Sequence, residues 1–147
     1  MTPLKPLGSL LLVIQMTQDC NHREKRMADI LIVDDQACIR EFVSDGLLSE
    51  GYRVATAANA ESVGRHLRLP QPDLIVLDLY LDGPDGPEVF HDIKRQYPRV
   101  PVIIFTAYDS YREDPRLSQA DGYVIKSIVL DELKAKIADL LRRKTAV

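Results

Sequence analysis

The sequence has little cysteine or histidine, no strong excess of one charge and no long apolar run, and each shortage excludes a class of protein. Its two cysteines, Cys20 and Cys38, and its three histidines show no metal-ligand spacing, so neither a zinc site nor a disulfide framework is expected. This cysteine usage fits a reduced, cytoplasmic protein. The formal net charge of −3 gives no electrostatic argument for binding nucleic acid.

Residues 1–28 differ in pattern from the rest of the chain, and we expect them to form a flexible leader. Their one apolar run, Leu10–Ile14, is too short to cross a bilayer. A secretory signal would need a stronger basic start and a small-residue cleavage site, so membrane association is not expected. Two alternatives stay open: the segment lies upstream of a natural start at Met27, or Leu10–Ile14 docks on the domain as an extra strand or helical turn.

Residues 29–147 alternate between short apolar runs and helical patterns, which predicts one domain with five strands. Arg53–Ala57 is a weak strand and is expected at an edge of the sheet. The other four runs are continuous, as in strands buried on both faces: Ile30–Val33, Leu74–Leu77, Val102–Phe105 and Tyr123–Ile125. The pattern predicts an α/β fold, with a parallel sheet covered by helices on both sides.

The helical patterns have recognisable ends and inward faces. In the first helix, apolar spacing predicts an inward face made of Ile39, Phe42, Val43, Gly46 and Leu47. Gly51 is expected to end this helix, and Asn59 is a candidate N-cap for the next one. The last helix is expected to begin at Asp131 and to carry cations in its last turn, where the helix dipole favours them.

Polar side chains follow four of the predicted strands, at the point where each strand ends. These residues are Asp34, Asp35, Asp78, Thr106 and Lys126. The carboxyl ends of parallel strands lie along one edge of a sheet, where ligands bind. Three carboxylates, a hydroxyl and an ammonium are therefore expected to meet at that edge.

This set of groups predicts a particular chemistry. Carboxylates that lie close together repel one another and need a cation. Mg²⁺ prefers oxygen ligands and is bound by one or two carboxylates together with waters and phosphate oxygens. A carboxylate beside it can act as a nucleophile and form an acyl phosphate, while the cations neutralise the transferring group. The pattern therefore predicts a magnesium-dependent site for phosphoryl transfer.

In combination and order, these motifs resemble the receiver domain of two-component response regulators. The matching stretches are ILIVDD, LIVLDLYLDGPDG, IIFTA and GYVIK. The resemblance covers roughly Asp29 to Arg143 and implies a flavodoxin-like, doubly wound sheet of five parallel strands in the order 2-1-3-4-5. It implies a phosphoacceptor signalling domain rather than an enzyme, although such a domain assists its own phosphorylation and dephosphorylation.

The resemblance also implies which residues accept the phosphoryl group and hold the metal. Asp78 would be the phosphoacceptor. Mg²⁺ would be bound by the carboxylates of Asp34, Asp35 and Asp78 and by the backbone carbonyl of Tyr80, with Asp35 a direct ligand. For Asp34, a simpler alternative is that it caps the following helix.

Further residues would bind the phosphoryl group and respond to it. The Lys126 ammonium, the Thr106 hydroxyl and the Ala107 backbone amide would contact the phosphoryl oxygens. Thr106 and Tyr123 would form the switch, in which the aromatic ring turns inward when the threonine moves. Simple core packing is the alternative for Tyr123.

The sequence departs from the family pattern at three places. Ser127 follows Lys126 where proline is usual, and Asp82 stands where proline is common. The segment between Thr106 and Tyr123 is shorter than usual, so the fourth helix is expected to be short, broken or displaced.

The expected function is a stand-alone receiver that takes a phosphoryl group from a histidine kinase or a phosphotransfer protein. Phosphorylation would then change its binding to a downstream protein partner, without direct contact to nucleic acid or membrane. Two alternatives stay open: a degenerate receiver that binds partners without phosphorylation, and a receiver cut from a larger hybrid kinase or regulator. Monomer and homodimer both stay open.

Overall fold

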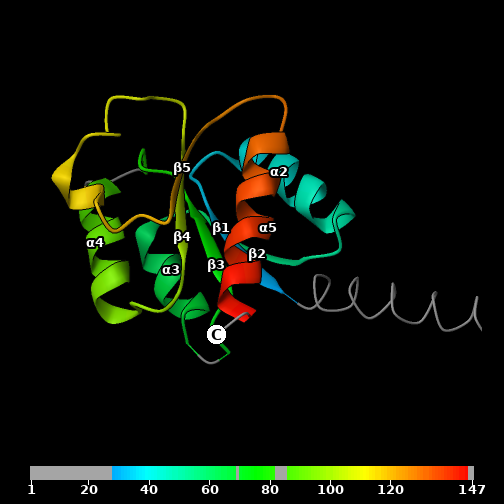
Figure 1. Ribbon diagram of the computed structural model, residues 1–147, viewed down its shortest axis with the longest axis horizontal. Coiled ribbons are helices and arrows are strands. Elements are labelled where there is room, and N and C mark those ends of the chain that lie inside the picture. Colours follow the sequence, from blue (N-terminus) through cyan, green and yellow to red (C-terminus); the bar gives the residue numbers. More distant parts are fainter. Residues whose placement is uncertain (1–27, 69, 82–85, 146–147) are drawn as a thin grey trace, which may run out of the picture.

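The fold is a three-layer sandwich with a central sheet and helices on both faces (Figure 1). The computed structural model describes residues 28–68, 70–81 and 86–145. The expected leader lies outside these residues except for Ala28, and Asp82 lies outside them as well. Among the described helices, none has both the length and the apolar character that crossing a bilayer would require.

The sheet has five parallel strands in the order β2-β1-β3-β4-β5, as the resemblance implies. The strands are β1 (Asp29–Val33), β2 (Arg53–Ala57), β3 (Leu74–Leu77), β4 (Val102–Thr106) and β5 (Gly122–Ile125). In register, Ile30 of β1 lies opposite Val54 on one side and Leu74 on the other. Every residue of β3 and β4 is buried, whereas the edge strand β2 is mostly exposed, as the sequence predicts.

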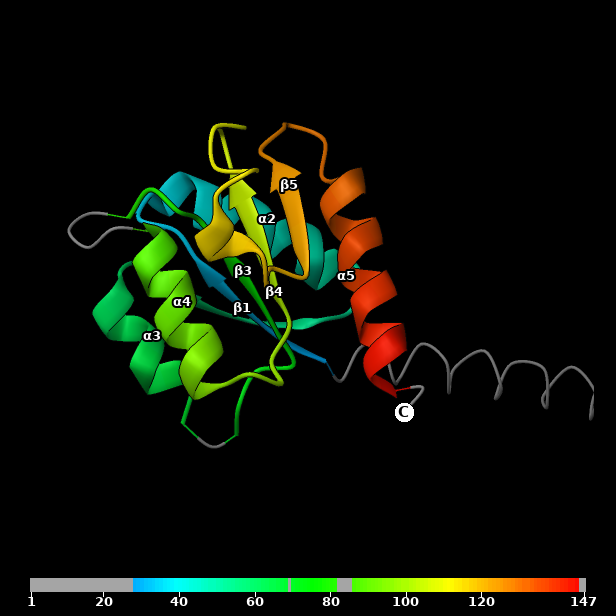
Figure 2. The same cartoon turned by 60° about the vertical axis from the view of Figure 1, so that its left-hand side comes forward.

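Within the described residues, two helices cover each face of the sheet. Figures 1 and 2 show α3 and α4 together on one face, with α2 and α5 on the other. Their bounds are α2 (Ala37–Ser49), α3 (Ala60–His66), α4 (Gly86–Gln96) and α5 (Asp131–Thr145). Alternate strand residues point to opposite faces, and they build two separate apolar cores. Leu31 belongs to the core under α3 and α4, and its neighbour Ile32 belongs to the core under α2 and α5.

The predicted helix ends are confirmed, but one residue of the predicted inward face is wrong. Gly51 follows α2 with a φ of 94°, a conformation that favours glycine. The Asn59 side chain caps α3 by accepting a hydrogen bond of 2.8 Å from Ser62 N. Phe42 was expected to face inward, yet it is 43% exposed, while Val43 is buried. Adjacent residues of a helix point about 100° apart, so with Val43 facing the sheet, Phe42 lies on the flank of α2.

The connection from β4 to β5 contains only a short helix, as expected. Residues 107–121 hold one 3-10 helix, η1 (Pro115–Leu117). Its first turn is stabilised by Asp114, whose side chain accepts a hydrogen bond of 2.9 Å from Arg116 N. Leu117 inserts into the core beneath α3 and α4. This buried leucine anchors η1 in the segment where the resemblance implies a fourth helix.

An ion pair between a buried lysine and a partly exposed aspartate joins α4 to the sheet. Lys94 is 8% exposed, and its Nζ donates to Asp121 Oδ2 at 2.7 Å and to the carbonyl of Val100 at 3.1 Å. The same Asp121 oxygen accepts a hydrogen bond from Val102 N at 2.8 Å. This network ties α4 to the starts of β4 and β5.

Replacing Lys94 with methionine is expected to destabilise the fold by about 1–3 kcal/mol, because the buried Val100 carbonyl and the partly buried Asp121 carboxylate lose their donor. The neighbouring variant Arg95→Met removes an exposed pair with Asp92 and should change stability by less than about 0.5 kcal/mol. Urea unfolding of both variants measures the difference. Equal stability of the two would show that the Lys94 network contributes nothing beyond a surface pair.

Candidate functional site

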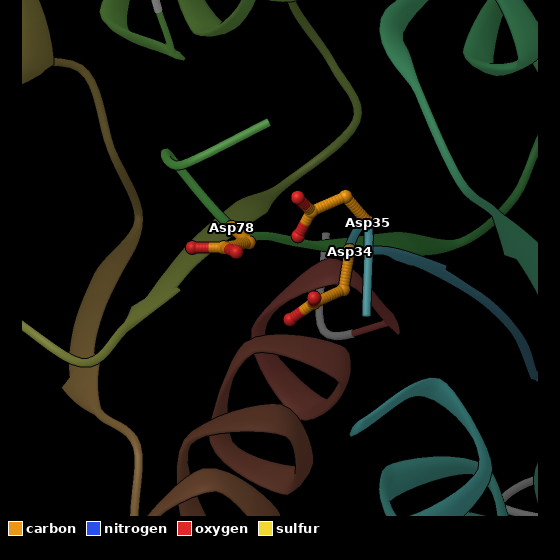
Figure 3. A group of neighbouring side chains, drawn as sticks. All are labelled: Asp34, Asp35 and Asp78. Carbon is orange, nitrogen blue, oxygen red and sulfur yellow. The ribbon is translucent and has the colours of Figure 1, made fainter. Parts of the chain in front are cut away.

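Three carboxylates meet where β1 and β3 end. Asp34 and Asp35 follow β1, and Asp78 follows β3, the neighbouring strand in the sheet. One carboxylate oxygen of each lies within 4.8 Å of the other two (Figure 3). Asp34 and Asp78 are buried, at 2% and 4% exposure, whereas Asp35 is exposed. The strand-end prediction is therefore correct about the position of these three residues.

The predicted lysine reaches the same place from the edge of the sheet. Lys126 follows β5, and two strands separate β5 from β1. Its Nζ nevertheless lies 2.7 Å from Asp34 Oδ2 and 3.2 Å from Asp78 Oδ2. The Lys126 backbone N–H donates to the carbonyl of Thr106 at 2.7 Å, which fixes the start of the side chain. A trio of ion-paired groups thus forms from distant parts of the chain.

Burial and charge compete at this trio. Burial raises the pKa of the Asp78 carboxyl, and the Asp34 charge raises it further. The Lys126 ammonium and the Tyr80 N–H, which donates to Asp78 Oδ1 at 3.2 Å, oppose this rise without cancelling it. For Lys126, burial acts to lower its pKa, but Asp34 and Asp78 outweigh burial and the pKa is raised. The lysine therefore stays charged.

The carboxylate oxygens of the three aspartates suit a hard divalent cation. Asp34 Oδ1 accepts a hydrogen bond from Gln36 N at 2.9 Å, so Asp34 shapes the turn before α2 as well as pairing with Lys126. Asp35 has no hydrogen bond or ion pair from its carboxylate to any residue that the structure describes. The Lys126 ammonium pairs with two of the three acids, and carboxylate oxygens grouped in this way are ligands that fit Mg²⁺. The metal-binding role of the Tyr80 carbonyl stays a prediction.

The two predicted switch residues are connected through Tyr108. Thr106 is fully buried, and its Oγ1 accepts a hydrogen bond of 3.5 Å from Tyr108 N. The Tyr123 hydroxyl donates to the Tyr108 carbonyl at 2.6 Å. Tyr123 is half-buried and packs against the core under α3 and α4. The switch role of these residues and the contact from the Ala107 amide stay predictions.

Sequence reasoning missed a group of aromatic rings beside the carboxylates, which we call the tyrosine group (Tyr80, Tyr108, Tyr111 and Tyr123). The Tyr80 ring lies 4.8 Å from the Tyr108 ring and 5.6 Å from the Tyr111 ring, between centroids. The Arg112 guanidinium lies 4.7 Å from the centre of the Tyr123 ring, within the range of a cation–π contact. The closely spaced tyrosines at 108 and 111 were the available signal.

The fold and the arrangement of acids and lysine agree with what the resemblance to receiver domains implies. The family model described as response regulator receiver domain matches residues 30–138, and the chain belongs to that family. Members of the family are phosphoacceptor signalling domains.

Known relatives agree with this assignment. The chain is 39% identical over 122 residues to the transcriptional regulatory protein AfsQ1 of Streptomyces coelicolor, covering 80% of this chain and 52% of the relative. It thus spans about half the length of the curated relatives it matches. Among solved structures, it resembles the response regulator TrrA of Thermotoga maritima in complex with Mg²⁺-BeF, with a TM-score of 0.74 and 39% identity, covering 78% of this chain and 99% of TrrA. TrrA in complex with the histidine kinase ThkA gives a TM-score of 0.73 at 40% identity, with the same coverage.

Proposed function

We propose that this receiver domain accepts a phosphoryl group on Asp78 in a Mg²⁺-dependent reaction and thereby changes its binding to a protein partner. The donor would be the phosphohistidine of a histidine kinase or of a phosphotransfer protein. The observation that carries the proposal is the position of Lys126 Nζ, 2.7 Å from Asp34 Oδ2 and 3.2 Å from Asp78 Oδ2. A lysine without a role at this site would be expected to extend into solvent, and not toward two buried carboxylates.

The chemistry follows from the position of each group. A carboxylate oxygen of Asp78 would attack phosphorus while the P–N bond of the phosphohistidine breaks, and the imidazole nitrogen leaves with the bonding electrons. The product is an acyl phosphate. Mg²⁺, held by Asp34, Asp35 and Asp78 with the Tyr80 carbonyl, would supply positive charge that neutralises the phosphoryl oxygens.

The other residues would bind the product and transmit its formation. Lys126 already contacts Asp78 and could pass from the carboxylate to a phosphoryl oxygen with little movement. The Thr106 hydroxyl would donate to the phosphoryl group, and its contact with Tyr108 N would then be lost. Because Tyr123 also contacts Tyr108, this shift would reach β5, and the domain would change between two surface states.

The relatives support the donor and the metal. TrrA has been crystallised with Mg²⁺-BeF and with a histidine kinase, and this chain covers nearly all of TrrA. The test is incubation of this protein with acetyl phosphate, with and without Mg²⁺, followed by intact-mass spectrometry. The addition of one phosphoryl group only when Mg²⁺ is present is expected. No addition in either condition would contradict the proposal.

A second function is favoured by one observation, the 3-10 helix between β4 and β5. If this departure reflects a lost switch, the domain would bind its partner without phosphorylation. The same mass measurement separates the two functions, because an interaction module of this kind gains no phosphoryl group.

Mg²⁺ alone is expected to raise the melting temperature, because binding to the folded site stabilises it by mass action. At a hundredfold excess of metal over its Kd, the gain is about 2.7 kcal/mol. Differential scanning fluorimetry over a range of MgCl₂ concentrations measures it, with KCl at matched ionic strength as the control. The variant Asp35→Asn should show a smaller rise. A flat response of the parent protein would argue against a metal site here.

A further inference from the structure

An arginine outside the acidic cluster contacts the backbone that carries two of its carboxylates. Arg40 lies in the first turns of α2 and is half-buried. Its Nη1 donates a hydrogen bond of 2.7 Å to the carbonyl oxygen of Asp34. A bond from a guanidinium to a carbonyl is charge-assisted and stronger than a neutral one. Neither the strand-end pattern nor the family motifs assign Arg40 a role.

The accepting carbonyl belongs to the peptide unit that joins Asp34 to Asp35. A peptide unit is planar, so fixing its oxygen also fixes the direction in which the chain enters Asp35. On the other side, Asp34 N donates to the carbonyl of Ala57 in β2 at 3.1 Å. The acidic pair is thus attached to the sheet on one side and to α2, through Arg40, on the other.

This attachment matters more for Asp35 than for Asp34. The Asp34 carboxylate is held by Lys126 at 2.7 Å and by Gln36 N at 2.9 Å. The Asp35 carboxylate is exposed and makes no such contact with the described residues. Among the described residues, no contact of its own side chain holds Asp35 in place. Its position relative to Asp78 therefore depends on the backbone that Arg40 holds.

We propose that Arg40 is a positioning residue that sets the Mg²⁺ affinity of the site by holding the Asp34–Asp35 peptide. This inference rests on the proposed Mg²⁺-dependent function. It also predicts that removing the Arg40 charge changes the Mg²⁺ affinity in the direction opposite to the one expected from charge alone. Removing a cation beside a metal site should tighten Mg²⁺ binding if charge alone counts. If positioning dominates, the same change should weaken binding, and partners that orient metal ligands are worth about 10–100-fold in affinity.

The experiment measures the Kd for Mg²⁺ of the parent, Arg40→Met, Arg40→Lys and Lys134→Met by isothermal titration calorimetry. Arg40→Met is expected to raise the Kd roughly 10-fold, and Arg40→Lys, which keeps a donor, should restore most of the affinity. Lys134→Met is the matched control, because it also removes a cation that contacts α2. Lys134 pairs with Glu50, which follows the C-terminal end of that helix, whereas Arg40 lies at its N-terminal end. The Kd of Lys134→Met should equal the parent value or fall slightly.

The outcomes separate the inference from the proposed function. An unchanged or lower Kd in folded Arg40→Met would overturn the positioning role while leaving the Mg²⁺ site intact. A parent protein that binds no Mg²⁺ would overturn both. Circular dichroism without metal checks the fold, and if Arg40→Met does not fold, Arg40→Gln is measured with the same expectation. Acetyl phosphate labelling should fall in Arg40→Met at low Mg²⁺ and recover at saturating Mg²⁺.

Discussion

The variant Asp78→Asn is expected to take up no phosphoryl group from acetyl phosphate under any Mg²⁺ concentration. An amide oxygen is a poor nucleophile and cannot form the acyl phosphate, although the substitution keeps nearly the same side-chain volume. Intact-mass spectrometry of the variant and the parent, run side by side, measures this loss. Asp35→Asn is the matched control, since it removes an acid of the same cluster and should slow labelling without abolishing it. Labelling of Asp78→Asn to the parent level would place the acceptor elsewhere.

The same variant should be more stable than the parent when no metal is present. The pKa of Asp78 is raised in the folded state, so ionising this carboxyl costs the folded protein free energy. That cost is absent below the ordinary pKa of aspartate and is complete above the raised pKa. Asp78→Asn should therefore exceed the parent in free energy of unfolding at neutral pH, and the difference should shrink as the pH becomes acidic. Urea unfolding at several pH values in EDTA measures it.

The variant Lys126→Met is expected to have the opposite effect and to lose about 3–5 kcal/mol of stability without metal. Lys126 is 16% exposed, and its removal would leave the carboxylates of Asp34 and Asp78 buried without a counter-charge. Mg²⁺ should restore part of this loss, because the metal neutralises the same oxygens. With Mg²⁺ present the variant should fold, but phosphorylation should no longer change its surface from one state to the other.

The pH dependence distinguishes the loss of this ion pair from general damage to the fold. The pKa of Lys126 is raised on folding, so its contribution is complete below the ordinary pKa of lysine and disappears as the pH rises through the raised value. The gap between parent and Lys126→Met should therefore narrow in strongly alkaline solution. Lys134→Met, which removes a partly exposed cation, should lose less than about 1 kcal/mol at any pH. A gap that does not change with pH would mean that the variant is destabilised by lost packing.

Much of the fold could be predicted because the strongest signals were local. Continuous apolar runs mark strands that are buried on both faces, and the observed strands begin or end within one residue of those runs. Gly51 and Asn59 were identifiable since their roles depend on backbone conformation and a short side chain. Phe42 was not, because periodicity gives the direction of an apolar stripe and leaves open how much of its width the sheet can cover.

In the candidate site too, some residue positions could be predicted from the sequence and others could not. The positions of Asp34, Asp78 and Thr106 follow from the topology alone, because parallel strands bring their carboxyl ends to one edge. Arg40 was missed because it is a long cationic side chain whose partner is a backbone carbonyl. Outside the site, Lys94 was missed because its partners are set by tertiary contacts. A hydrogen bond to a backbone carbonyl, as Arg40 makes to Asp34, has no signature in the partner's residue type.

The tyrosine group gives this receiver a built-in optical probe. The chain has six tyrosines and no tryptophan, and four of the six form this group. Most of the tyrosines, which emit in the ultraviolet, therefore lie in the tyrosine group, where a nearby charge, a ring displacement or a change in the Tyr123 hydrogen bond would alter the emission intensity. The proposed metal binding and phosphorylation at this edge should therefore change the tyrosine emission, so that both could be followed in real time on the unmodified protein, without an attached dye.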